Sequence, residues 1–169
     1  DSWDVSDDTL TYTFHLKSGT KFQDGSPVEA KDVAYSISRL MSINEGPAYL
    51  FEGVLDANSV TALDSSTVQF KLNKVYTPFL TNTPIMFVVN SDVAEANKTD
   101  SDPWAQDFLA NTSAGAGAYM LDSWARGASM TIKKFDDYHL GWNDQSLDEV
   151  RFVITNEEAT VKALAASGV

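Results

Sequence analysis

Acidic side chains that are neighbours in the sequence are the groups in this chain with the most obvious chemistry. Two carboxylates held together can act as general acid and general base in hydrolysis. The chain has four such pairs, which are Asp7/Asp8, Asp136/Asp137, Asp148/Glu149 and Glu157/Glu158. Adjacent carboxylates mostly point in different directions and belong to solvated turns or helix starts. We therefore predict that none of them forms a glycosidase-type catalytic pair.

The two histidines are the only residues that could supply the base of a Ser/His/Asp arrangement. His15 follows Thr11 and Thr13 on one face of a predicted strand, which indicates an exposed or cross-strand role. His139 lies in the aromatic-rich stretch 136–142, where packing is expected. Neither histidine is accompanied by a Gly-x-Ser-x-Gly nucleophile motif. The sequence predicts a protein that is not an enzyme.

Metal and cofactor sites lack their usual motifs. With no Cys, the chain has no disulfide framework and no thiolate zinc site. The acidic stretch 136–144 does not have the spacing of a calcium loop. The run Ala114-Gly-Ala-Gly117 lacks both the Gly-Lys-Ser/Thr ending of a P-loop and the third Gly of a dinucleotide fingerprint. We expect no metal and no cofactor.

The same glycine run is a candidate for a different role. Glycine allows the backbone to turn tightly into a strand, and it also allows the backbone to approach a ligand closely. A tight turn is the simpler interpretation. The second interpretation makes Ala114 and Gly115 candidate ligand-binding residues.

Aromatic side chains are the other binding candidates, and most of them are expected to be packing residues. Tyr49 differs because Gly46-Pro47-Ala48-Tyr49 places an aromatic ring with a hydroxyl on a loop after a predicted helix. An exposed loop aromatic is a better binding candidate than a strand aromatic. Tyr49 and Pro47 are therefore predicted to contact a ligand.

Composition narrows the class of protein. At 169 residues and 43% hydrophobic content, the chain can bury a real core. The net charge of −12 argues against nucleic acid and anionic lipid as partners, since both need clustered basic residues. No apolar run reaches the ~18 residues of a membrane span. The absence of a start signal and the abrupt ends lead us to expect a fragment of a longer chain.

The periodicity of apolar residues predicts the elements that position these candidates. Alternation over Leu10–Leu16 predicts a strand, followed by turns at Ser18-Gly19 and Asp24-Gly25. An amphipathic helix then starts near Ala30 and ends at Asn44–Pro47.

The remainder of the chain alternates between short strands and short helices. The expected elements are a hairpin of 59–63 with 67–72, a short helix or turn at 76–80, a strand at 85–89, a polar segment at 90–113 with one or two short helices around 104–109, a hairpin of 119–124 with 129–135 that turns at Arg126-Gly127, a strand at 150–154, and a helix from a capping box at Thr155–Glu158 to about Ala166 with Gly168 as its stop. This order predicts an α+β class with mixed, mainly antiparallel sheets and packed helices. The polar segment 90–113 indicates a boundary between two subdomains.

Three stretches resemble one protein family. The first runs from Trp3 through Leu10–Lys17 to Phe22-Gln-Asp-Gly-Ser-Pro-Val-Glu-Ala-Lys-Asp-Val-Ala-Tyr-Ser36, the second is Gly115-Ala-Gly-Ala-Tyr-Met-Leu with Trp124, and the third is Leu147-Asp-Glu-Val-Arg-Phe with Ala163–Gly168. Together they resemble the solute-binding proteins of peptide/nickel-type ABC importers, which include dipeptide- and oligopeptide-binding proteins. Two departures are Glu29, where the family usually has Thr or Ser as a helix cap, and Asp136–His139, where Asn-Pro-x-Tyr-Trp is common.

The resemblance implies a part of a periplasmic-binding-protein type II-like fold, in which two lobes close on a ligand. It implies that residues 1–113 form a small α+β subdomain of the first lobe and that residues 114–169 form part of that lobe's main domain, with the second lobe absent. The loop of Tyr49 resembles a segment that faces the cleft.

The implied function is capture of peptides or similar small solutes for ABC permease subunits. The implied location is extracytoplasmic, either in the periplasm or as a cell-surface lipoprotein. A carboxylate-based hydrolase domain and the solute-binding-like sensory domain of an intracellular regulator are the alternatives.

Overall fold

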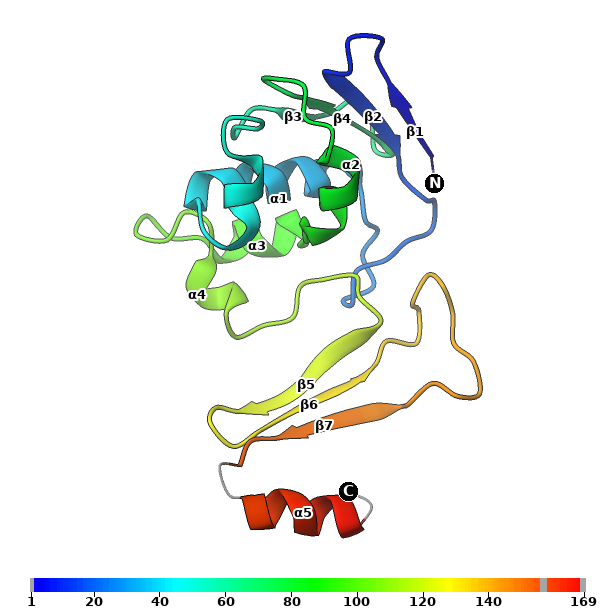
Figure 1. The fold of residues 1–169 in the computed structure, drawn as a ribbon, viewed down its shortest axis with the longest axis vertical. Helices are drawn as coiled ribbons and strands as arrows, with labels where there is room; N and C mark the ends of the chain where they lie inside the picture. Colours follow the sequence, from blue (N-terminus) through cyan, green and yellow to red (C-terminus); the bar gives the residue numbers. More distant parts are fainter. Residues whose placement is uncertain (1, 156–157, 168–169) are drawn as a thin grey trace.

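The computed structural model describes residues 2–155 and 158–167, and it contains two antiparallel sheets separated by a layer of short helices (Figure 1). The four-stranded sheet lies at one end of the view, helices α1 to α4 lie between the sheets, and the three-stranded sheet lies beyond them. This architecture confirms the predicted α+β class.

The first sheet has the order β1-β2-β4-β3, with strands β1 (Ser2–Val5), β2 (Thr11–His15), β3 (Val60–Ala62) and β4 (Thr67–Lys71). Every neighbouring pair is antiparallel. The register places Tyr12 opposite Phe70 and Phe14 opposite Val68, so the alternating apolar residues of β2 and β4 share one face. That face packs into the hydrophobic core, as the alternation of apolar residues in the sequence predicts.

Helix α1 (Ala30–Ile43) packs on the apolar face of this sheet. Ala30 and Ile37 are fully buried, which confirms the predicted core-facing stripe. The start of the helix is closed by Asp32, whose carboxylate accepts a hydrogen bond of 2.8 Å from the Glu29 N–H. This contact compensates for a poor capping residue at Glu29. The helix ends at Asn44, which adopts a left-handed conformation with φ 56°.

Aromatic rings fill the centre of the small subdomain. Phe79 is fully buried and its ring centroid lies 4.6 Å from that of Tyr12, 5.5 Å from that of Phe70 and 6.5 Å from that of Phe51. Edge-to-face and tilted contacts of this kind are the favoured geometries for aromatic pairs.

Short helices lie between α1 and β3 and between β4 and β5. They are η1 (Gly46–Phe51), α2 (Phe79–Asn82), η2 (Thr83–Ile85), α3 (Ser91–Asn97) and α4 (Gln106–Leu109). Helix α2 confirms the expected short element near 76–80, and α4 confirms the short helix expected around 104–109. Helix α3 lies earlier in the same polar segment than the helices were expected.

The predicted strand at 85–89 is wrong. Pro84 stands inside the 3-10 turn η2, and the chain then runs past α1 without joining a sheet. The Val89 N–H donates to the Ser36 hydroxyl over 3.0 Å instead of to a strand. The Val89 N–H, which would bond to a neighbouring strand in a sheet, is thus satisfied by a side chain of α1.

The second sheet has the order β5-β6-β7, with strands β5 (Tyr119–Ala125), β6 (Ser129–Lys134) and β7 (Glu149–Val153). It confirms the predicted second hairpin and the strand near 150–154, and Gly127 has the positive φ of 75° that the turn requires. Helix α5 (Glu158–Ser167) confirms the last predicted helix. The interior of its predicted capping box and the stop at Gly168 lie outside the described residues.

Contacts between distant segments join the small subdomain to the second sheet. The Gln23 N–H donates to the Gly115 carbonyl over 3.0 Å, and the Gln23 amide donates to the carbonyls of Gly117 and Tyr119 over 3.1 and 2.8 Å. Lys21 adds an ion pair of 2.6 Å to Asp137. These bonds set the position of the second sheet beneath the helices.

Candidate functional site

A cavity of about 290 Å³ opens beside the outward face of α1, and we call it the Pro47 pocket. It is enclosed by the second half of α1, the start of η1, the segment 85–89 and the first residue of α4. Its lining residues are Ser36, Arg39, Leu40, Ile43, Glu45, Gly46, Pro47, Ile85, Phe87, Val89 and Gln106. The walls combine aliphatic side chains with one cation, one anion and one amide, as is usual in sites for small polar solutes.

The segment 84–89 separates this pocket from the apolar core. Ile85, Phe87 and Val89 line the Pro47 pocket, whereas Pro84, Met86 and Val88 line a mainly apolar cavity against Phe14, Val33 and the sheet. The side chains thus alternate between two sides, as in a strand, although the segment belongs to no sheet.

Two large aromatic side chains are exposed near this pocket. Tyr49 is 72% exposed on η1, two residues beyond the lining residue Pro47, and Phe87 is 79% exposed at the pocket wall. Exposed aromatic rings supply large contact areas at low entropic cost and often dominate binding energy. Pro47 is a lining residue of the pocket and Tyr49 is not, and their predicted contact with a ligand stays a prediction.

Arg39 connects the pocket to α4. Its Nε donates a 2.9 Å hydrogen bond to the Trp104 carbonyl, and the Trp104 ring lies 5.6 Å from the ring of Tyr35. Burial of the Tyr35 hydroxyl raises the pKa of that group. The α1 face and the loop before α4 are therefore held together by one hydrogen bond and one aromatic contact at the edge of the pocket.

Ala114 and Gly115, the other two predicted binding residues, do not line the Pro47 pocket. The Ala114 carbonyl accepts from the Asn90 N–H over 2.9 Å, and the Gly115 carbonyl accepts from Gln23. A Cβ atom at Gly115 would meet nothing closer than the Gly117 nitrogen at 4.0 Å, and its φ is not positive. Neither a tight turn nor crowding therefore requires glycine there. The structure places this loop at the junction between the two sheets.

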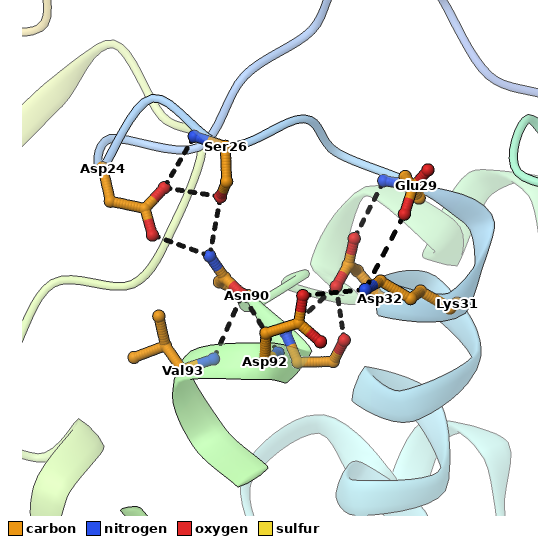
Figure 2. Close-up of polar contacts among 9 residues, drawn as sticks. Asp24, Ser26, Glu29, Lys31, Asp32, Asn90, Asp92 and Val93 are labelled. Atoms are coloured by element: carbon orange, nitrogen blue, oxygen red, sulfur yellow. Dashed lines mark hydrogen bonds and ion pairs between the residues drawn. The ribbon is translucent and has the colours of Figure 1, made fainter. Parts of the chain in front are cut away.

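A cluster of polar contacts with a buried centre lies between α1 and α3 (Figure 2). Asp32 is 1% exposed, and its carboxylate accepts from the Glu29 N–H, from the Ser91 N–H over 3.0 Å and from the Ser91 hydroxyl over 2.5 Å. Asn90 caps α3 by accepting from the N–H groups of Asp92 and Val93. The carboxylates in this cluster are engaged in holding two helix starts together.

A second carboxylate, Asp24, enters the cluster from the turn before α1. It accepts from the Ser26 N–H over 2.9 Å, from the Ser26 hydroxyl over 2.6 Å and from the Asn90 amide over 2.9 Å. Hydrogen bonds from the Ser26 hydroxyl and N–H hold the pKa of Asp24 below its usual value, with a smaller contribution from Asn90. Figure 2 shows Asn90 between this turn and the start of α3.

We expect Asp24→Asn to destabilise the protein at pH 6–7 and to lose this effect on acidification. A carboxylate whose folded pKa is depressed stabilises the fold above its unfolded pKa of about 3.9, and this contribution disappears as the pH falls through the folded pKa. Urea unfolding midpoints at pH 7 and pH 3 measure the difference. Asp100→Asn, at an exposed loop position, is the control. A wild-type advantage that stays the same at both pH values would contradict this assignment.

The histidines do not form a catalytic arrangement with these carboxylates. Nε2 of His15 lies 3.0 Å from Asp4 on the neighbouring strand, which confirms the cross-strand role. His139 is exposed and lies edge-on against Tyr138 at 4.7 Å between centroids. Within residues 2–155 and 158–167, no group of three His, Asp or Glu side chains has a geometry that could hold a metal ion.

Comparison with known families shows which family the chain belongs to. The model of the bacterial extracellular solute-binding proteins, family 5, middle region, matches residues 1–169. The chain belongs to this family. The resemblance seen in the sequence is confirmed, and the family 5 chain is therefore related to binding proteins.

Relatives and solved structures agree with this assignment. The probable D,D-dipeptide-binding periplasmic protein DdpA of Escherichia coli K12 is 35% identical over 161 residues, which cover 94% of this chain and 30% of the relative. The dipeptide-binding protein DppE of Bacillus subtilis 168 is 29% identical over 186 residues, which cover 99% of this chain and 33% of the relative. The ABC transporter substrate binding protein CtaP of Listeria monocytogenes has the same fold at TM-score 0.82 and 27% identity, with 99% of this chain and 33% of that chain covered.

The family 5 chain spans about a third of the length of these relatives. In the part of the chain that the structure describes, no helix is long and apolar enough to cross a membrane.

Sequence reasoning missed Arg39, Phe87 and Gln106 as pocket residues. Phe87 was assigned to the strand predicted at 85–89, and Arg39 stands among the apolar residues of a helix that was interpreted only as a core element. The sequence does show the alternation of this segment, because Ile85, Phe87 and Val89 fall on one side of an extended chain and Pro84, Met86 and Val88 fall on the other.

Proposed function

We propose that the family 5 chain is part of the first lobe of an extracytoplasmic solute-binding protein, and that its Pro47 pocket and Tyr49 form one wall of the ligand cleft. The proposed ligand is a peptide or a similar small solute, which the whole protein delivers to ABC permease subunits. The observation that carries the proposal is a cavity with mixed polar and apolar walls, which has the exposed Phe87 in its lining and the exposed Tyr49 two residues beyond its lining residue Pro47.

The proposed division of the chain follows the two sheets. Residues 1–113 would be the small subdomain and residues 114–169 part of the main domain, with the second lobe supplied by chain outside this sequence. Ligand binding across two lobes shifts the balance from an open to a closed form by its differential affinity for the closed form.

A binding role without catalysis is supported by the use of the acidic groups. Asp24 and Asp32 have their oxygens occupied by hydrogen bonds that hold turns and helix starts, so they are poorly placed to transfer protons to a substrate. The names of the relatives, which include dipeptide- and oligopeptide-binding proteins, support peptides as the first ligand class to test. We propose a location in the periplasm or, as a lipoprotein, on the cell surface.

Thermal-shift and calorimetric screening of the full-length protein tests the proposal. The panel contains dipeptides, tripeptides, longer peptides, nickel chelates and oligosaccharides. A peptide at a hundred times its Kd stabilises the folded form by about 2.7 kcal/mol, which gives a clear rise in Tm. Turnover of a panel compound without stable binding of any class would refute the proposed function.

Tyr49→Ala should weaken peptide binding by about tenfold and leave Tm within about 1 °C of the wild type. An exposed aromatic that packs on a ligand contributes on the order of 1–2 kcal/mol to binding, whereas its removal from the free surface barely changes stability. Trp3→Ala, at a 55% exposed aromatic on β1, is the matched control. Equal affinity for wild type and Tyr49→Ala would show that η1 does not contact the ligand.

A further inference from the structure

Residues 110–118 join helix α4 to strand β5 without forming a helix or strand of their own, and we call them the connector. The connector contains Gly115 and Gly117. Neither glycine has a left-handed φ, and a Cβ atom at either position would meet nothing closer than 4.0 Å. Glycine gives a backbone access to several conformations. Since no turn or crowding selects the observed path at these two positions, contacts with other segments must select it.

Gln23 supplies contacts of this kind from the segment between β2 and α1, which extends toward the second sheet (Figure 1). Its backbone N–H donates to the Gly115 carbonyl over 3.0 Å. Its side-chain amide donates to the carbonyls of Gly117 and Tyr119 over 3.1 and 2.8 Å, and its amide oxygen accepts from the Ser113 hydroxyl. Both the nitrogen and the oxygen of this amide are therefore bonded to the connector or to the first residue of β5.

Other contacts between the small subdomain and the second part of the chain are more limited. Lys21 pairs with Asp137 through side chains that are 46% and 56% exposed, and exposed ion pairs contribute little to stability. The Asn90 N–H bonds to the connector at a single point, the Ala114 carbonyl. Gln23 is partly buried and bonds to several successive groups, so it defines a backbone path and not only one point of contact.

We propose that Gln23 is a positioning residue, which holds the connector in one conformation and thereby sets the orientation of the small subdomain relative to the second sheet. Without these bonds, the glycine-containing connector acts as a hinge and allows several orientations. The consequence for ligand binding rests on the proposed function, because the Pro47 pocket belongs to the small subdomain. Only molecules in the observed orientation present the pocket correctly, so the apparent affinity falls in proportion to their fraction.

Double electron–electron resonance on the full-length protein tests the inference without any ligand. Spin labels are attached to cysteines introduced at Glu52 and Ala128, two exposed positions at the end of η1 and in the turn between β5 and β6, with no other cysteine present. The variants are Gln23→Met, which keeps the length of the side chain and removes its donors, and Ser113→Ala, which removes one of its partners. Gln69→Met is the matched control, because the partly buried Gln69 amide bonds within the first sheet, to the Thr13 hydroxyl over 3.3 Å.

Wild type and Gln69→Met should each give one narrow distribution of distances between the labels. Gln23→Met should give a clearly wider distribution or a second distance, and Ser113→Ala should give a smaller change of the same kind. Circular dichroism checks that each variant is folded, and Ser113→Ala carries the test if Gln23→Met is not. A Gln23 that contributes only to stability would lower Tm and leave the distance distribution unchanged, which would overturn the inference.

Calorimetric titration with a peptide from the screen measures the consequence for binding. A variant in which about a third of the molecules keep the wild-type orientation should bind the peptide about threefold more weakly than wild type. Gln69→Met should match wild type. If wild type binds no peptide or other solute of the panel, the proposed function falls, whereas the label distances decide separately whether Gln23 sets the orientation.

Discussion

Replacing Phe79 by alanine should lower the free energy of unfolding by about 4 kcal/mol, the largest effect that we expect from one substitution in the small subdomain. The ring is fully buried and contacts Tyr12, Phe51 and Phe70, which come from β2, η1 and β4. Truncation of a buried Phe removes its transfer free energy and leaves a cavity among residues that relax only partly, at a combined cost of about 3–5 kcal/mol. Urea unfolding followed by circular dichroism measures the loss.

Phe87→Ala provides the matched control, since it removes the same side chain from a position that is 79% exposed. We expect its unfolding midpoint to stay close to that of wild type. Comparable losses for both variants would mean that Phe79 is not the centre of the core. Because Phe87 lines the Pro47 pocket, the same control variant should still weaken peptide binding.

Asp32→Ala should destabilise the protein by about 3 kcal/mol. The buried carboxylate accepts three hydrogen bonds, and its removal leaves the Ser91 hydroxyl and two backbone N–H groups without their partner. A buried donor that loses its acceptor costs about 1–3 kcal/mol, and the three losses share one cavity, so they do not add fully. Urea unfolding at pH 7 is the measurement.

Asp92→Ala is the control for the cluster of Figure 2, because Asp92 belongs to the same group but its side chain is 77% exposed and, among the described residues, pairs only with Lys31. An exposed ion pair contributes at most about 1 kcal/mol. If Asp32→Ala were as mild as Asp92→Ala, the cluster would not hold α1 and α3 together.

Much of the fold follows from the sequence because its elements bury one face each. The strand containing Tyr12, the hairpin with Val68 and Phe70, and helix α1 all have a clear period, and the structure confirms them. Strand β1 was not predicted. All four of its residues are exposed, so this edge strand has no buried face to impose a period on its sequence. The strand predicted at 85–89 is absent, and the apolar residues of that segment line two different cavities instead of one buried sheet face.

The candidate site was predicted only in part. Tyr49 and Pro47 were selected as a loop aromatic and its neighbour, and these are local properties that a sequence displays. Arg39 and Gln106 line the same pocket from two helices that are distant in the sequence. Their proximity depends on the hydrogen bond from Arg39 to the Trp104 carbonyl, a tertiary contact without any local pattern. Ala114 and Gly115 were chosen for backbone freedom, yet their carbonyls serve the junction with Gln23 and Asn90.

The arrangement gives the buried cluster a role in the proposed site. Asp32 and Ser36 on α1 hold Ser91 and Val89, so the pocket wall at 85–89 is fixed at its carboxyl end by the same helix that forms the opposite wall. Binding residues supported in this way keep their geometry in the absence of ligand, which lowers the entropy lost on binding.

A crystal structure of the full-length protein with a peptide from the screen tests the central claim most directly. We predict that ligand atoms lie within about 4 Å of Tyr49 or Phe87 and that a ligand group occupies the Pro47 pocket. A peptide enclosed by other parts of the protein, with Tyr49, Phe87 and the Pro47 pocket all out of contact, would contradict the account.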